Sequence, residues 1–278
     1  MLSHRSSRDG FSSYTYNGLS SLQKVVTQEC TSSKERRHIV FNEVPPHAIE
    51  YLLSAGEQVL PPSPRICAYD KNKGLLVFKT PIAVHELPIQ ELRYVIQQQV
   101  RRLKLHSLLA EMGRTSFKSQ DDSVGKEPDL AWKADIDPEG TKERKWPQVT
   151  IEVGNSETGF QLKDYARFWL VESAGGVKYS LTLDLLPNRI SLISWGLKAD
   201  DENEVEVRTE MTVTKDHDAG GTWEHHPDSS MAICLAVDDI LRHLTPENAR
   251  GKSLMIKMDD LIAIAREYDR GRMIQGVL

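Results

Sequence analysis

Two segments near the middle of the chain constrain its fold most strongly, because they resemble the two strands of one hairpin. The first covers residues 128–134 and the second covers 148–154, with a charged connection containing Gly140 between them. A regular antiparallel hairpin that turns near Gly140 sets Asp129 opposite Glu152. In that register the two Cβ atoms lie roughly 4.5–5.5 Å apart on one face of the sheet.

Side chains alternate along a strand, so the two faces of this hairpin differ in character. The face predicted to point into the core carries Leu130, Trp132, Val149, Ile151 and Val153. The other face carries the two carboxylates together with Ala131, Lys133, Thr150 and Gly154. The sequence therefore predicts an acidic face on which most of the neighbouring side chains are small.

Two facing carboxylates repel unless a proton, a lysine or a metal ion lies between them. Mg²⁺ is typically held by one or two carboxylates, waters and substrate phosphate, which is the chemistry of metal-assisted phosphodiester hydrolysis. The alternative is that Asp129 and Glu152 are solvated positions on the outer face of an edge hairpin, because the chain has 40 acidic residues.

Three runs of sequence resemble a known superfamily. These are Glu127-Pro128-Asp129, the run from Trp146 to Glu157, and the run from Leu162 to Leu170. Together they resemble the PD-(D/E)XK restriction-endonuclease-like superfamily, and more narrowly its fungal members related to bacterial restriction-endonuclease-like proteins. The resemblance covers roughly the middle third of the chain.

The resemblance implies an α/β core made of a helix, a three-stranded antiparallel meander, a second helix and a further strand. It implies that Asp129 and Glu152 ligate Mg²⁺, or Mn²⁺, with the backbone carbonyl of Val153 as a third ligand. The family motif places a lysine two residues after the acidic ligand, where this chain has Gly154.

Another lysine would have to take over the task of positioning the attacking water. Lys178 is favoured slightly over Lys163, because it starts a strand expected to neighbour that of Glu152, whereas Lys163 shares a helix with many solvated charges. Lys133 and Lys126 are the other candidates.

Composition favours an intracellular protein, nuclear or cytoplasmic. The hydrophobic content of 39% is adequate for a large core, and no apolar run approaches the roughly 18 residues of a membrane span. The three cysteines lack CxxC spacing, which argues for a reducing compartment. Residues 1–38 hold six Lys/Arg and three Asp/Glu, so the net charge of −5 leaves −8 on residues 39–278. Nucleic acid is therefore a candidate partner only if part of the surface is locally positive.

Residues 1–37 are predicted to be a disordered tail, because 12 of the first 33 residues are Ser or Thr and no apolar period is sustained. The cluster Lys34–Arg37 is either a weak nuclear-localisation signal or a solvated boundary. Residues 38–278 are predicted to form a single domain, with its core at about 84–195 and β/α additions at both ends.

The longest helical pattern covers residues 87–112 and carries Arg101, Arg102 and Lys104 off its apolar stripe, where they are either phosphate ligands or plain solvation. His85-Glu86, just before it, matches a position that is polar and near the site in similar proteins. The alternative for Glu86 is a favourable charge at a helix N-terminus.

A second helix is predicted to begin after Thr158, which has capping-box spacing to Gln161, and to end at Gly175-Gly176. Its apolar face consists of Leu162, Ala166, Trp169 and Leu170. Strands are predicted at 177–185, 190–195 and from Val205, followed by a strand and helix over 231–244, a strand near Leu254 and a helix over 259–268.

Two other kinds of site fit the residues less well. Residues 154–158 follow a strand as a nucleophile elbow would, but the closing glycine of G-x-S-x-G is absent. Residues 216–218 and 224–226 are rich in Asp, Glu and His, but their spacing matches no standard zinc site. The sequence therefore predicts a Mg²⁺-dependent nuclease, or one that has lost activity, with a non-catalytic binding protein on the same fold as the competing class.

Overall fold

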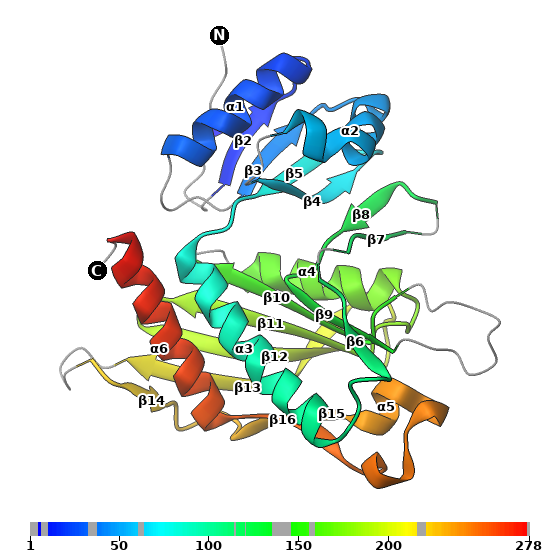
Figure 1. Ribbon diagram of the computed structural model, residues 1–278, viewed down its shortest axis with the longest axis vertical. Helices are drawn as coiled ribbons and strands as arrows, with labels where there is room; N and C mark the ends of the chain where they lie inside the picture. Colours follow the sequence, from blue (N-terminus) through cyan, green and yellow to red (C-terminus); the bar gives the residue numbers. More distant parts are fainter. Residues whose placement is uncertain are drawn as a thin grey trace. The chain divides into compact units, whose positions relative to one another are not determined.

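The computed structural model describes residues 5–6, 11–32, 38–60, 64–113, 115–119, 121–134, 146–155, 159–215 and 221–276 (Figure 1). The chain forms two compact units, which we call the first and the second unit. The first consists of Met1–Ile82 and Thr115–Glu127, and the second of Ala83–Arg114 and Pro128–Leu278. The expected single domain over 38–278 is therefore not what the structure shows. In the sequence, Thr115–Glu127 lies between two segments of the second unit, but its strands belong to the first unit. No change of composition marks the point where the chain goes back to the first unit.

The first unit is a seven-stranded sheet with two helices, and its strand order is β1-β2-β3-β5-β4-β8-β7. The helices are α1 (Leu19–Ser32) and α2 (Pro46–Val59). The strands are β1 (Arg5–Ser6), β2 (Phe11–Thr15), β3 (His38–Asn42), β4 (Arg65–Asp70), β5 (Leu75–Lys79), β7 (Phe117–Lys118) and β8 (Val124–Lys126). The strands expected at residue 38 and on either side of the turn at 70–74 are confirmed.

The N-terminal tail is the largest difference from the expectation. Residues 11–32, predicted to be disordered, form β2 and α1, and α1 buries Leu22, Val25 and Val26 in the core of the first unit. Tyr14 of β2 donates a hydrogen bond from its hydroxyl to Glu29 of α1, at 2.5 Å. Three apolar positions among many Ser and Thr residues gave too weak a period to be recognised. The cluster at 34–37 lies outside the described residues.

The second unit is also built on a seven-stranded sheet, of order β14-β13-β12-β11-β10-β9-β6. Its strands are β6 (Leu109–Glu111), β9 (Leu130–Ala134), β10 (Val149–Asn155), β11 (Tyr179–Leu186), β12 (Arg189–Leu197), β13 (Val205–Lys215) and β14 (Trp223–His225). Strands β10 and β11 are parallel and the other neighbours are antiparallel.

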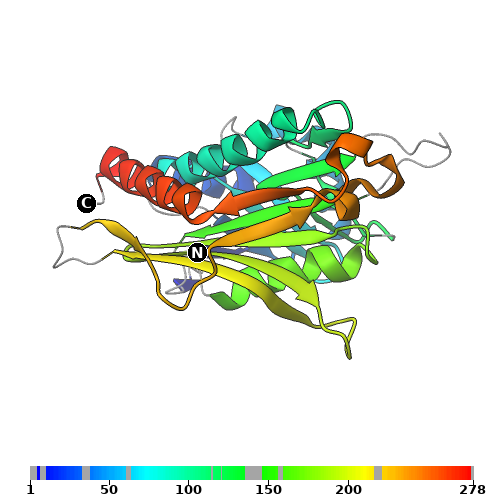
Figure 2. The ribbon, with the colours of Figure 1, turned by 90° about the horizontal axis from the view of Figure 1, so that it is seen from below.

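Helices cover both faces of this sheet, as Figure 2 shows: α3 (Ala83–Arg102) and α6 (Met258–Gln275) lie on one face and α4 (Gly159–Glu172) on the other. A small sheet of β15 (Ala232–Ala236) and β16 (Ser253–Lys257) and the short helix α5 (Val237–Leu241) complete the unit. The α/β class and the order of helix α3, antiparallel strands β6, β9 and β10, helix α4 and strand β11 agree with the core that the resemblance implies.

Helix α3 is shorter than predicted. It ends at Arg102 instead of Met112, Lys104 has a positive φ of 58°, and Leu109–Glu111 is strand β6. A non-glycine residue in the left-handed region cannot continue a right-handed helix. The apolar residues beyond Leu103, which extended the helical period in the sequence, are therefore used by a loop and a strand.

The close approach of α6 to α3 depends on Gly271. A Cβ atom at this position would lie 2.7 Å from the Cα atom of Val84 and 2.8 Å from the carbonyl oxygen of Ala83. Because both are backbone atoms, a side chain can be accommodated only if the helices separate.

We expect Gly271→Ala to lower the free energy of unfolding by about 1–3 kcal/mol, the usual cost of overpacking. Thermal melting measures this, with Gly113→Ala as the matched control, because a Cβ there meets nothing within 4 Å. Equal melting of the two variants would contradict the close contact between α3 and α6.

Candidate functional site

The hairpin register predicted from the sequence is confirmed. Leu130 pairs with Ile151 and Trp132 with Val149, so Asp129, directly before β9, continues the register toward Glu152 of β10. Both residues are buried, Asp129 at 9% and Glu152 at 4% exposure. The solvated outer face of an edge hairpin is therefore not observed, because α4 covers that face of the sheet.

The carboxylate of Glu152 is held from the α4 side. Oε1 accepts a hydrogen bond from the indole Nε1–H of Trp169, a residue of α4, at 2.7 Å. Ala131 and Thr150, on the same face as Glu152, are both fully buried. The face predicted to be open and acidic is instead a packed layer with Glu152 hydrogen bonded inside it.

The carboxylate of Asp129 is held from the α3 side. Its Oδ2 accepts the backbone N–H of Val153 at 2.9 Å and lies 3.3 Å from Nε2 of His85, a residue in the first turn of α3. The side chains of Asp129 and His85 are 1% and 0% exposed. These two residues are thus a buried pair that joins the start of α3 to the end of the β9–β10 hairpin.

The His85 ring contacts three oxygen atoms. Nε2 lies 3.0 Å from the carbonyl oxygen of Val153 in addition to Asp129, and Nδ1 lies 3.2 Å from Oε1 of Glu86. All three oxygens are hydrogen-bond acceptors, so the ring can only donate to them. A neutral imidazole donates from one nitrogen, and an imidazolium donates from both. His85 therefore supplies hydrogen-bond donation at this point.

The Mg²⁺ ligand set that the resemblance implies does not fit this arrangement. Two of its three proposed ligands, Asp129 Oδ2 and the Val153 carbonyl, both face the same imidazole nitrogen, and the third, Glu152, is hydrogen bonded on the α4 side. Mg²⁺ demands oxygen ligands in near-octahedral geometry, whereas a nitrogen donor already lies between these two oxygens. Within the described ranges, no group of three His, Cys, Asp or Glu side chains is placed to hold a metal ion.

The position of the missing motif lysine is tightly packed. Gly154 lies in β10 beside Asp184 of β11, and a Cβ atom on it would meet three carbon atoms of Leu162 at 3.0–3.2 Å. Leu162 belongs to the buried face of α4, together with Ala166, Trp169 and Leu170, as the sequence predicted. A side chain at residue 154 would therefore require Leu162 to shift by a few tenths of an ångström.

The structure does not bring either favoured substitute lysine to Glu152. Lys178 donates its backbone N–H to the carbonyl oxygen of Gln148. It precedes Thr182, the β11 partner of Glu152, by four residues, which is about 13 Å along the strand. Lys163 is partly exposed, and its Nζ lies 3.9 Å from Oε2 of Glu204.

The two remaining candidates are placed differently. Lys133 lies in β9 opposite Ala110 of β6. It follows Asp129 by four residues, which is again about 13 Å along the strand. Lys126 is buried in β8, which belongs to the first unit.

Two functional contacts were not predicted. His85 was noted only as a polar position near the site, and Trp169 only as part of an apolar helix face. For Trp169 a signal existed, because a buried indole N–H requires an acceptor and Glu152 is a strong one. For His85 the partner is 44 positions away in the sequence, and no local pattern connects the two.

The other candidate sites gain no support. Ser156 and residues 216–218 lie outside the described residues. His225, from the second group, has its Nε2 3.2 Å from the backbone carbonyl of Ser229.

Comparison with known proteins finds structural likeness but no sequence match. No family model matches the chain, and no curated protein matches it. Among solved structures, the chain is similar to a candidate nuclease belonging to DUF820 from Anabaena variabilis, at 14% identity and a TM-score of 0.41. The match covers 72% of this chain and 90% of the other. At this level of similarity, the function of this chain has to be argued from its own residues.

Proposed function

We propose that this chain is a non-catalytic binding protein built on a nuclease-like α/β fold, in which the imidazole of His85 takes the place of a catalytic cation. The observation that carries this proposal is the position of His85 Nε2, 3.0 Å from the Val153 carbonyl oxygen and 3.3 Å from Asp129 Oδ2. A donor at this point offsets the negative charge of Asp129, which is otherwise the task of a divalent ion.

Hydrolysis of a phosphodiester would need more than the arrangement offers. The attacking water has to be activated by a metal ion or a positioned base, and the developing charge has to be stabilised by a cation. Gly154 occupies the lysine position, and Lys133, Lys163 and Lys178 lie elsewhere on the second unit. The buried pair of Asp129 and His85 is better suited to fixing α3 on the sheet than to chemistry.

The alternative function is a nuclease that uses Mg²⁺ or Mn²⁺ bound by Asp129, Glu152 and the Val153 carbonyl. One observation favours it: Asp129 Oδ2 and the Val153 oxygen lie within reach of a single atom, His85 Nε2. If the His85 ring rotated away, the two oxygens could share a small cation. Nucleic acid would then be the substrate.

Cys30, Cys67 and Cys234 form no disulfide, which favours a reducing compartment for either function. Among helices in the described ranges, none combines the length and the apolar character needed to cross a membrane.

Metal-dependent melting separates the two functions. We expect Mg²⁺ and Mn²⁺ to leave the melting temperature of the full chain unchanged, because an N–H donor lies where the ion would bind. His85→Ala should remove that donor, so Mn²⁺ should stabilise this variant by about 2.7 kcal/mol at 100 times its Kd. Adding Asp129→Asn to His85→Ala should abolish the gain.

A cleavage assay on single-stranded and duplex nucleic acid, in Mg²⁺ and in Mn²⁺, completes the test. No cleavage is expected. Stabilisation of the unaltered chain by Mg²⁺, lost in Asp129→Asn and in Glu152→Gln and accompanied by cleavage, would overturn the proposal in favour of the nuclease.

A further inference from the structure

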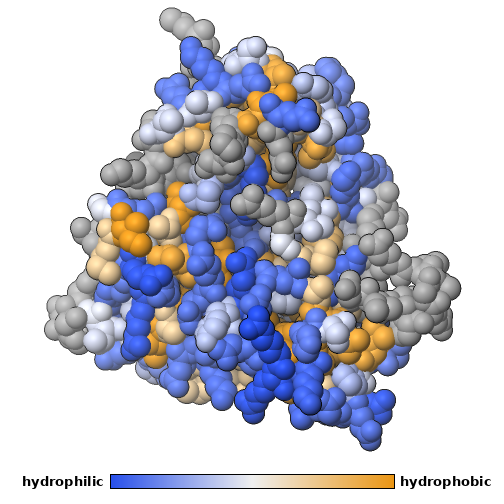
Figure 3. Space-filling model, viewed as in Figure 1, coloured by the Kyte–Doolittle hydropathy of each residue, from blue (hydrophilic) through white to orange (hydrophobic). Residues whose placement is uncertain are grey.

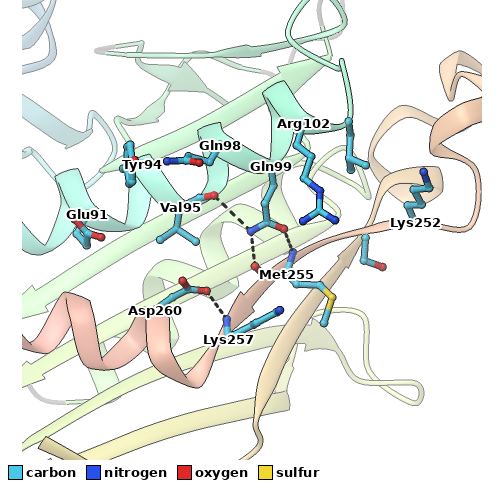
Figure 4. Close-up of a pocket in the computed structure, with 12 residues that line it drawn as sticks. Glu91, Tyr94, Val95, Gln98, Gln99, Arg102, Lys252, Met255, Lys257 and Asp260 are labelled. Atoms are coloured by element: carbon cyan, nitrogen blue, oxygen red, sulfur yellow. Dashed lines mark hydrogen bonds between the residues drawn. The ribbon is translucent and has the colours of Figure 1, made fainter.

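A groove in the second unit lies between α3 and β16, near the start of α6 (Figure 4). Its volume is about 710 Å³, which is in the range of small-ligand sites. The side chain of Gln99 joins its two walls: it donates from Nε2 to the Met255 carbonyl, and its Oε1 accepts the Met255 N–H at 2.6 Å. The groove is therefore a fixed feature, lined by residues other than Asp129 and His85.

Charged side chains line both ends of this groove, as Figure 4 shows. Arg102 of α3 and Lys252, just before β16, lie at one end, and Glu91, Asp260 and Lys257 lie toward the other. Neither Arg102 nor Lys252 forms an ion pair with another residue in the described ranges. By contrast, Asp260 is engaged, because its carboxylate accepts the backbone N–H of Lys257 at 2.8 Å. One end of the groove thus carries two uncompensated positive charges.

An exposed aromatic ring lies on the same helix. Tyr94, Gln98 and Arg102 are spaced four residues apart, so they follow one side of α3, and Tyr94 lies roughly 12 Å along the axis from Arg102. Tyr94 is 56% exposed, although large aromatic side chains are usually more buried. The surface over α3 is largely hydrophilic (Figure 3).

We propose that this groove binds single-stranded nucleic acid. Arg102 and Lys252 contact phosphates, Tyr94 stacks on a base, and the amide of Gln98 meets a base edge, which together are the elements of single-strand recognition. The exposed ring of Tyr94 favours a strand that carries bases over an acidic peptide, because a base can stack on it. The inference deepens the proposed function by naming a ligand, but it depends on residues that the metal experiments do not alter.

Fluorescence anisotropy of the full chain tests this inference, with a labelled single strand of about a dozen thymidines, within the site sizes of known single-strand binders. We expect binding at low salt. Arg102→Gln with Lys252→Gln should reduce the slope of log K against log salt by about 1.4, because each phosphate contact on a single strand contributes about 0.7. Arg266→Gln, on an exposed arginine of α6, is the matched control and should leave the slope unchanged.

The stacking contact is tested separately. Tyr94→Ala should weaken binding about tenfold, Tyr94→Phe should keep it, and Tyr51→Ala, which alters a 47% exposed tyrosine of the first unit, should have no effect. Each variant is first checked by thermal melting. Absence of binding at low salt, or equal slopes for the double variant and Arg266→Gln, overturns the proposal. Equal competition by inorganic polyphosphate with no effect of Tyr94→Ala would show a general anion site instead and also overturns it.

Discussion

A chain that begins at residue 33 is expected to lose the folded structure of its first unit. The deletion removes β2 and α1, and with them four of the buried core residues of that unit: Tyr14, Leu22, Val25 and Val26. Each buried side chain of this size contributes about 1.5–3 kcal/mol. The total loss is of the same order as the whole stability of a small domain.

The deletion also uncovers an edge of the sheet. Strand β2 pairs in parallel with β3, from Phe11 with His38 to Thr15 with Asn42, so its removal exposes the backbone donors and acceptors of β3. An unpaired edge strand with a buried apolar face favours association with other chains. We therefore expect the truncated protein to aggregate as well as to unfold.

Limited proteolysis and near-ultraviolet circular dichroism measure this effect. In the full chain, residues 11–32 should be as resistant as the rest of the first unit, whereas the truncated chain should be cut within 38–82. A point variant gives an independent check: Leu22→Ala should cost about 2–5 kcal/mol, and Lys24→Ala, an exposed position on the same helix, should cost almost nothing. A truncated chain that melts like the full one would refute the prediction.

This N-terminal segment shows where the sequence was insufficient. Its composition is typical of disorder, but a helix needs only one narrow apolar stripe when a sheet is available to pack against. Leu22, Val25 and Val26 form that stripe, and the sheet that they cover comes from residues 38–79, later in the chain. The deciding contact is tertiary, and the local sequence carries little of it.

The β9–β10 hairpin shows the opposite case. Alternating apolar residues and one turn region fixed its register, because a shift by one residue would place Trp132 and Ile151 on the wrong face. What the register did not determine is the direction of the two carboxylates. Glu152 turns to the Trp169 indole on α4, 17 residues later, and Asp129 turns to His85 on α3, far earlier in the chain.

The contact between Asp129 and His85 predicts a large effect on stability. His85→Ala removes the donor that faces Asp129 Oδ2 and the Val153 carbonyl, and leaves the carboxylate 1% exposed without that partner. Breaking a buried charged pair by removing one member typically costs about 3–5 kcal/mol. For a unit of this size we expect the melting temperature to fall by roughly 6–20 °C.

Two controls assign this loss to the pair. His106→Ala removes an exposed histidine just beyond α3 and should change the melting temperature little. Adding Asp129→Asn to His85→Ala should restore part of the lost stability, because a neutral amide is less costly to bury than a carboxylate that has lost the imidazole, while its oxygen can still accept the Val153 N–H. If the two substitutions instead add without coupling, His85 contributes only packing, and the imidazole does not compensate the charge of Asp129. That result would also remove the main support for a site in which a histidine takes the place of a metal ion.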